Sequence, residues 1–262
     1  MFFGYTKSFR TFALSKATNE AQMRLTYIYH SCFAIEGEDY TVLIDFFKDT
    51  EGDFDTGYVN RNLLTRGGRL YVLSSHSHHD HFSKKILKWK EKRNDIIYIL
   101  SEDILLCNKA KQNDAHFIDK GEIYKDDLLT VTAFGSTDIG VSFLIEIEGK
   151  QIFHAGDLNN WHWNEESTPE EAAQAEQLFI SELADISAKI SHFDVAMFPI
   201  DKRLGKDYMR GAEQFLFAVK TDLFVPMHFG KYYESAAAIR PFAESKGGRI
   251  VQWSHKGQSV EL

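Results

Sequence analysis

The sequence predicts an α/β fold, with some α+β character, in which helices pack on sheets. After residue 70, short apolar runs alternate with longer amphipathic ones, as expected for strands followed by helices. Three separate apolar runs end in metal-binding residue types, at His76, Asp157 and His228. The chain of 262 residues can bury one large core and is too short for two domains and a linker.

The first elements along the chain are typical of a β-hairpin. Residues 25–35 and 40–46 are rich in Tyr, Ile, Val and Phe, and a short Gly-containing segment separates them. This prediction places His30 inside the first strand, either as a buried, hydrogen-bonded histidine or at the edge of a site. Residues 48–68 hold four glycines without periodicity, so we expect a surface loop with one helical turn.

The remaining elements follow from their hydrophobic patterns. Further strands are predicted at residues 70–75, 96–100, near 117, 128–134, 141–148, 151–154, 195–200, 223–227 and 250–253. Helices are predicted at residues 84–92, 102–111, 169–191, 208–219 and 234–244. The longest begins with acidic residues and ends near Lys189, so its charges suit the helix dipole.

The segment after residue 70 carries the strongest chemical signal. His76, His78, Asp80 and His81 have the spacing His-x-His-x-Asp-His directly after a strand-like run. Side chains alternate faces in an extended chain, so His76, His78 and Asp80 can share one side. His81 can join them only where the backbone changes conformation, as at the start of the next helix. Imidazole and carboxylate donors suit zinc, iron or manganese, and the alternative is a solvated, histidine-rich turn.

This spacing resembles the defining loop of the metallo-β-lactamase-fold hydrolases, and the likeness runs from about residue 23 to the C-terminus. Two further segments match in the same order, one ending in His-Ala-Gly-Asp157 and the other in Val-Pro-Met-His228. The opening Tyr-His-Ser-Cys-Phe-Ala-Ile-Glu36 looks like a branch of uncharacterised metal-dependent hydrolases near the ascorbate-phosphate lactonases. The resemblance implies a four-layer αββα sandwich over residues 23–262.

The same resemblance implies a site for two divalent ions. It assigns His76 and His78 to the first ion, Asp80, His81 and His228 to the second, and Asp157 to a position between them. Zinc is the expected metal, with manganese or iron as alternatives. Asp45, at the end of a predicted strand, is implied to support the metal loop, because ligating imidazoles need their other N–H held.

The loop at residues 134–142 departs from the family pattern. Most members place a third histidine for the first ion there, whereas this chain offers Ser136, Thr137 and Asp138. Asp138 can supply a carboxylate oxygen, which favours manganese or iron over zinc. The alternative is that Asp138 caps its own turn, which leaves the first ion weakly held.

Four residues outside the metal motifs are candidates for substrate binding: His30, Trp161, His162 and Arg203. Trp161 and His162 follow the presumed bridging aspartate, and rings there either pack under a lid or line a pocket, which is the favoured reading. Arg203 can meet an anionic substrate or form a surface ion pair. His154 faces away from its strand neighbours and is expected to be structural.

These features favour a metal-dependent hydrolase. Two ions about 3.5–4 Å apart lower the pKa of a shared water to roughly 7, so a bridging hydroxide is the expected nucleophile and Asp80 its proton partner. The charges of the ions, aspartates and hydroxide leave a mildly positive pocket, which favours small anionic esters, lactones or phosphoesters. The alternatives are a diiron redox enzyme on the same scaffold and an inactive metal-binding or regulatory relative.

Composition limits the remaining possibilities. A formal net charge of −8 and a pI near 5.8 fit a cytoplasmic protein and disfavour a nucleic-acid surface. Cys32 and Cys107 are far apart, which argues against a disulfide or thiolate zinc site. No apolar run reaches the ~18 residues that a membrane span needs. We expect a small-molecule substrate as the partner and an N-terminal extension at residues 1–22.

Overall fold

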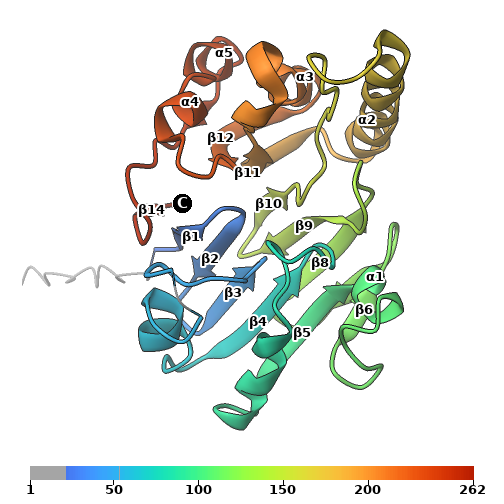
Figure 1. Ribbon diagram of the computed structural model, residues 1–262. Coiled ribbons are helices and arrows are strands. Elements are labelled where there is room, and N and C mark those ends of the chain that lie inside the picture. Colours follow the sequence, from blue (N-terminus) through green and yellow to red (C-terminus); the bar gives the residue numbers. More distant parts are fainter. Residues whose placement is uncertain (1–21, 53) are drawn as a thin grey trace, which may run out of the picture.

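The computed structural model describes residues 22–52 and 54–262. It shows two mixed sheets packed face to face, with helices on both outer sides (Figure 1). This is the α/β, αββα sandwich that the sequence predicts. The predicted N-terminal extension lies outside the described residues except for its last position. Within the described residues, no helix is long and apolar enough to cross a membrane.

The first sheet combines an antiparallel half with a parallel half. Its strands are β1 (Arg24–Tyr29), β2 (Cys32–Glu36), β3 (Tyr40–Ile44), β4 (Arg69–Ser74), β5 (Ile96–Ser101), β6 (His116–Ile118) and β14 (Ser259–Glu261). Their order is β14-β1-β2-β3-β4-β5-β6. Neighbours run antiparallel from β14 to β3 and parallel from β3 to β6. The carboxyl ends of β3, β4 and β5 therefore meet at one edge.

The second sheet repeats this arrangement. Its strands are β7 (Ile123–Lys125), β8 (Leu129–Phe134), β9 (Ser142–Ile147), β10 (Lys150–His154), β11 (His192–Pro199), β12 (Lys220–Met227) and β13 (Arg249–Ile250). The order is β13-β12-β11-β10-β9-β8-β7. Strands β10 to β13 run parallel and β7 to β10 antiparallel. This sheet therefore also has an edge at which parallel strands end together.

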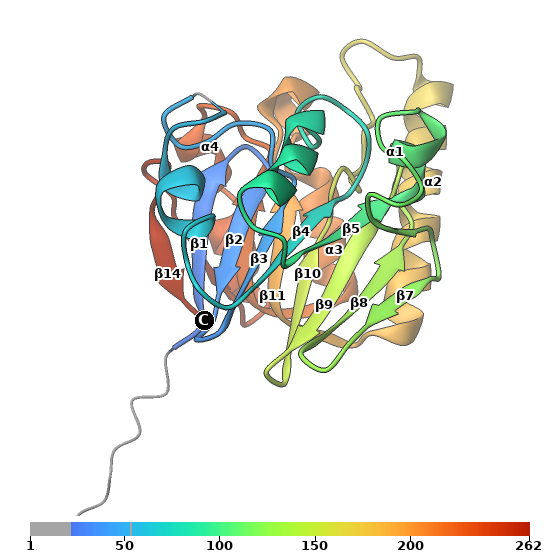
Figure 2. The ribbon, with the colours of Figure 1, turned by 90° about the horizontal axis from the view of Figure 1, so that it is seen from below.

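Helices cover the outer faces of both sheets. They are η1 (Val59–Leu63), η2 (Lys84–Glu91), α1 (Glu102–Leu106), α2 (Pro169–Lys189), η3 (Lys202–Asp207), α3 (Arg210–Ala218), α4 (Tyr233–Ala237) and α5 (Arg240–Ser245). Seen from below, η1 and η2 lie in front of the first sheet (Figure 2). Helix α2 begins with a capping box, in which Thr168 Oγ1 accepts from the Glu171 N–H and the Glu171 carboxylate accepts from the Thr168 N–H.

Strand β4 shows why the sequences of the central strands are continuous apolar runs. Leu70 and Val72 pack in one hydrophobic cluster with the residues of η1 and η2, whereas Tyr71 and Leu73 pack in the cluster between the sheets. Side chains alternate faces along a strand, and both faces of this strand are buried. The polar residues that follow β4 therefore lie next to a rigid core.

Several predicted elements differ from those observed. Residues 25–35 form two strands rather than one, and His30 lies in the turn between them at a φ of +57°. The sequence does not predict this turn, because it contains no Gly, Pro or Asn. The predicted helix at 102–111 ends at Leu106, and the one at 234–244 is divided into α4 and α5. The final predicted strand is only Arg249–Ile250. Strands β7 and β14 have three residues each, which is too short for a recognisable period.

Candidate metal centre

The polar residues of the site follow strands that end at the same edge of the sandwich. β4 ends two residues before His76, β10 ends three before Asp157, and β12 ends directly before His228. Polar side chains beyond the carboxyl ends of parallel strands commonly form the binding site of such sheets. The structure thus brings the three predicted segments together.

A first group of donor atoms comes from His76, His78, Asp138 and Asp157, and these atoms lie within 4.8 Å of one another. His78 Nδ1 lies 3.1 Å from Asp138 Oδ2, and His76 Nε2 lies 3.7 Å from Asp157 Oδ2. Donors bound to one ion at about 2.1 Å lie roughly 3.0–3.5 Å apart, so this spacing suits a shared cation. Asp138 supplies the fourth donor from the loop in which the family resemblance predicts a histidine.

A second group comes from His30, Asp80, His81 and His228, again with donor atoms within 4.8 Å. His30 Nε2 lies 3.4 Å from Asp80 Oδ2, and the ring centroids of His30 and His228 are 3.9 Å apart. The His228 N–H donates to the His30 carbonyl at 3.3 Å, which holds the β1–β2 turn against the end of β12. His30 therefore lies at the site, which was one of the two predicted alternatives, but as a candidate metal donor rather than the predicted substrate contact.

Asp157 lies between the two groups. Its Oδ1 is 3.1 Å from His81 Nε2 and 3.5 Å from His228 Nε2, both in the second group. Its Oδ2 faces His76 of the first group. The two oxygens of one carboxylate are therefore directed at different donor groups, as a bridging position requires.

The buried donors fit bound cations. The Nε2 atoms of His30, His76, His81 and His228 and Asp157 Oδ1 are buried without a hydrogen-bond partner among the described residues. Most buried polar atoms in proteins are hydrogen-bonded, because an unpaired buried donor or acceptor is costly. Five unpaired atoms that converge from separate segments are explained if divalent ions bind there.

The other ring nitrogen of three histidines is held by a neighbour. His81 Nδ1–H donates to Asp45 Oδ2 at 2.7 Å, and His228 Nδ1–H donates to Asp201 Oδ2 at 2.9 Å. His76 Nδ1 lies 3.0 Å from Ser75 Oγ, which itself donates to Asp45. A proton held on Nδ1 leaves the lone pair on Nε2, facing the site.

Asp45 thus makes the contacts that a supporting role requires. Asp201 does the same for His228, although no sequence motif marks it. The signal that identifies Asp201 is its position, just beyond the end of β11 at the same edge as the other residues.

The environment favours the metal-binding protonation states of several donors, whereas the Asp157 and Asp45 carboxylates outweigh burial and raise the pKa of His81. Burial lowers the pKa of His30 and of His76 to about 4, so both rings are neutral at neutral pH. Burial raises the pKa of the Asp157 carboxyl, but the nearby His228 and His81 lower it by more, and the net shift is downward. Burial likewise raises the pKa of Asp80, but the adjacent His30 and His81 together lower it by more, and the net shift is downward.

A cavity of about 380 Å³ borders the donors. Its lining residues are His78, Asp80, Thr137, Asp138, Asp157, Trp161, Trp163, Arg203 and His228. Trp161 therefore lies where a pocket-lining role was predicted. Arg203 forms an ion pair with the Asp201 carboxylate and also borders the cavity. This volume suits a small organic molecule.

His162 does not line this cavity, which contradicts its predicted contact with substrate. Its side chain is buried, with Nε2–H donating to the Asp207 carbonyl at 3.3 Å and Nδ1 accepting from the Asn164 N–H. Trp161 and Trp163 line the cavity, whereas His162 between them is buried. His154 is structural as predicted: it is buried and its Nε2 lies 2.8 Å from the Ser31 carbonyl oxygen.

Comparisons with known proteins place the chain in a known family. A family model described as a β-lactamase superfamily domain matches residues 24–180, which include His76, His78, Asp80, His81 and Asp157. A UPF0173 metal-dependent hydrolase of Bacillus velezensis is 25% identical over 260 residues, covering 92% of this chain and 100% of that protein. One from Natranaerobius thermophilus is 26% identical over 222 residues, covering 80% and 85%.

Solved structures share the fold. Igni18, a metallo hydrolase from Ignicoccus hospitalis, has a TM-score of 0.63 at 18% identity, covering 92% of this chain and 98% of that chain. CmlA, a diiron β-hydroxylase from Streptomyces venezuelae, has a TM-score of 0.64 at 15% identity, covering 92% and 54%.

Proposed function

Because the chain belongs to the metallo-β-lactamase superfamily of metal-dependent hydrolases, we propose that it cleaves an ester, lactone or phosphoester bond of a small anionic substrate. The proposed nucleophile is water activated between two divalent ions. Zinc is the proposed metal, and the carboxylate of Asp138 makes manganese or iron the alternatives.

One observation carries this proposal: Asp157 directs its two oxygens at different donor groups. The first group, with His76, His78 and Asp138, and the second group, with its three histidines and Asp80, each offer enough donors for one ion. When bound, two divalent ions lower the pKa of a shared water to near 7 and stabilise negative charge that develops on the substrate.

Asp80 is the proposed proton acceptor. It borders the cavity, and its lowered pKa keeps it ionised at neutral pH. Its Oδ2 lies 3.4 Å from His30 Nε2, which orients the carboxylate. Asp45 and Asp201 hold the histidine rings while the proton moves.

The charges around the cavity favour an anionic substrate only when metal ions are bound. Asp80, Asp138 and Asp157 border the cavity, whereas Arg203 is the one lysine or arginine among the described lining residues. Without cations the three carboxylates repel an anion. Two divalent ions add about four positive charges and make the cavity mildly positive.

A substrate panel tests the proposal. Protein loaded with zinc, manganese or iron should hydrolyse at least one of p-nitrophenyl phosphate, bis(p-nitrophenyl) phosphate, p-nitrophenyl acetate and a sugar-acid lactone. Asp157→Asn should lower kcat/KM on the order of 100-fold or more with an unchanged circular dichroism spectrum. Asp127→Asn is a matched control, because this exposed carboxylate pairs with Arg69 away from the site. Turnover of neutral amides alone, or full activity of Asp157→Asn, would contradict the proposal.

A diiron redox enzyme is the second candidate. CmlA, which shares the fold, is described as a diiron β-hydroxylase, and the three carboxylates here suit iron. Iron-loaded protein with visible absorption, oxygen consumption and no hydrolysis of the panel would favour this candidate. Tight metal binding with neither activity would instead indicate an inactive or regulatory relative.

A further inference from the structure

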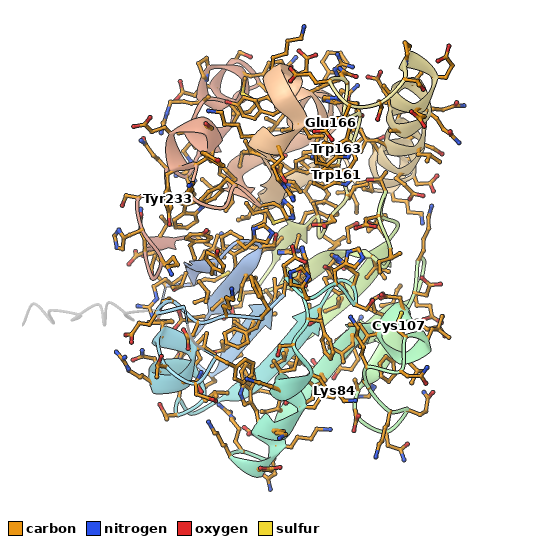
Figure 3. All side chains as sticks on the ribbon, in the orientation of Figure 1. Lys84, Cys107, Trp161, Trp163, Glu166 and Tyr233 are labelled. Carbon is orange, nitrogen blue, oxygen red and sulfur yellow. The ribbon has the colours of Figure 1, made fainter. Side chains whose placement is uncertain are left out.

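Two tryptophans line the metal cavity side by side. The rings of Trp161 and Trp163 lie nearly parallel, at an angle of 15° with centroids 6.1 Å apart (Figure 3). Both side chains are only partly buried. The Trp161 ring is held beside the donors, because its Nε1–H donates to the Asp157 carbonyl at 2.8 Å and its ring lies 5.6 Å from that of His228. A stacked pair of aromatic rings therefore borders the proposed reaction site.

These rings are the apolar part of the cavity wall. Every other lining residue that the structure describes is polar or charged. An apolar group of a bound substrate can therefore make favourable contacts with these two aromatic rings and with no other described lining residue.

The segment that carries the tryptophans is firmly held. The Thr137 hydroxyl donates to the Asn159 carbonyl at 2.6 Å, and Asn160 Nδ2 donates to Gln214 of α3 at 2.9 Å. Asn164 Nδ2 donates to the Asp207 carboxylate at 3.1 Å, and the N–H of Glu166 donates to the Trp163 carbonyl. The rings are thus fixed in place before a ligand binds, which limits the entropy lost on binding.

Backbone strain at Trp163 points to function rather than packing. Its φ is +43°, a conformation that bulky residues rarely adopt. Of the five other non-glycine residues with positive φ in the described part of the chain, three hold or support the metal donors: His30, Asp45 and His228. Strained residues concentrate at functional sites, and Trp163 has no metal contact to explain its strain.

We propose that Trp161 and Trp163 form an aromatic platform that binds a planar, preferably aromatic, group of the substrate next to the bond that is cleaved. The inference deepens the proposed function by naming the substrate class: small anions whose acidic group is attached to a planar ring. The anion lies toward the cations and Arg203, and the ring rests on the platform.

Calorimetric titration of zinc-loaded protein with phosphonates tests this inference without requiring turnover. Phenylphosphonate should bind about tenfold more tightly than methylphosphonate, and cyclohexylphosphonate should bind more weakly than phenylphosphonate. Trp163→Gly should remove most of this preference and leave the methylphosphonate affinity within about twofold. Because glycine adopts positive φ without strain, this variant should keep or raise the Tm.

Two control variants complete the test. Trp163→Phe should restore part of the preference for phenylphosphonate, and Phe217→Ala, which removes an exposed ring from α3, should leave the preference unchanged. Equal affinity for the three phosphonates in the unmodified protein, or an unchanged preference in Trp163→Gly, would overturn the platform. If the protein hydrolyses no substrate of the panel but Trp163→Gly loses the preference for phenylphosphonate, the result would support the platform and contradict the proposed hydrolysis.

Discussion

Asp138 determines the donor chemistry of the first group. Its Oδ2 lies 3.1 Å from His78 Nδ1 in a loop where a histidine is expected from the family resemblance. A carboxylate oxygen is a harder donor than imidazole, so the first group has two nitrogen and two carboxylate donors. Its members His78 and Asp138 are also more exposed than the other donors. This group should therefore hold its ion less tightly than the second group.

Asp138→His should shift metal preference toward zinc. A third imidazole suits zinc better than manganese, so we expect the ratio of zinc to manganese affinity to rise about tenfold. Competition between the two metals, followed by elemental analysis, measures the ratio. Asp138→Asn is the control that removes charge without adding imidazole, and the same ratio in Asp138→His as in the unmodified protein would argue against ligation at this position.

Asp45 acts through His81 and Ser75. Asp45→Asn replaces the carboxylate that accepts from His81 Nδ1–H and should weaken metal binding about 10- to 100-fold. Chelator competition measures the change. Asp49→Asn is a matched control, since this buried carboxylate accepts from the N–H groups of Thr50, Val59 and Asn60 and should affect stability instead. Equal metal affinities for the two variants would contradict the role of Asp45.

At the scale of elements, the sequence predicts the strands that deliver His76, Asp157 and His228. Each pairs in parallel with at least one neighbour and is buried at its carboxyl end, which leaves an apolar run with a clear end. The β1–β2 turn is not predictable in this way, because it contains no Gly, Pro or Asn and tertiary contacts hold the positive φ of His30. Asp201 escapes prediction because its partner His228 lies 27 residues away and meets it only in the folded chain.

Helix α2 is stabilised by the capping box at its start. Thr168→Ala removes the oxygen that accepts from the Glu171 N–H and should lower the free energy of unfolding by about 1 kcal/mol. Urea denaturation measures this change. Ser187→Ala near the other end of α2 is the control and should change stability by less than ~0.5 kcal/mol. A loss no larger than in the control would show that the box contributes nothing.

At the scale of the whole molecule, the site joins the two sheets. His76 follows a strand of the first sheet, whereas Asp157 and His228 follow strands of the second. The αββα architecture was predictable from the resemblance of the metal motifs to the metallo-β-lactamase-fold hydrolases, whereas the alternating patterns alone predict only helices packed on sheets. The pairing of β14 with β1 was not, since it joins three residues near the C-terminus to the first strand.

Metal binding should therefore stabilise the whole fold. An ion present at 100 to 1,000 times its Kd adds about 2.7–4.1 kcal/mol to the free energy of unfolding, which raises the Tm by roughly 5–15 °C. Thermal scans of chelator-treated and reloaded protein measure the shift. Asp157→Asn should show a clearly smaller shift. An identical Tm for treated and reloaded protein, with metal uptake verified, would contradict a site that joins the sheets.

A third group of metal-binding residue types lies away from the site. His192, Asp194 and Asp222 come together at the amino ends of β11 and β12, opposite the site. His192 and Lys220 both pair with Asp222, so this carboxylate already has partners within the protein. The central claim therefore concerns only the two groups around Asp157.

Anomalous diffraction from crystals of the metal-loaded protein tests that claim most directly. The account predicts two anomalous peaks, one on each side of Asp157. One should lie within bonding distance of His76, His78 and Asp138, and the other within bonding distance of His30, Asp80, His81 and His228. A single peak that Asp157 does not bridge, or peaks only near His192, would contradict it.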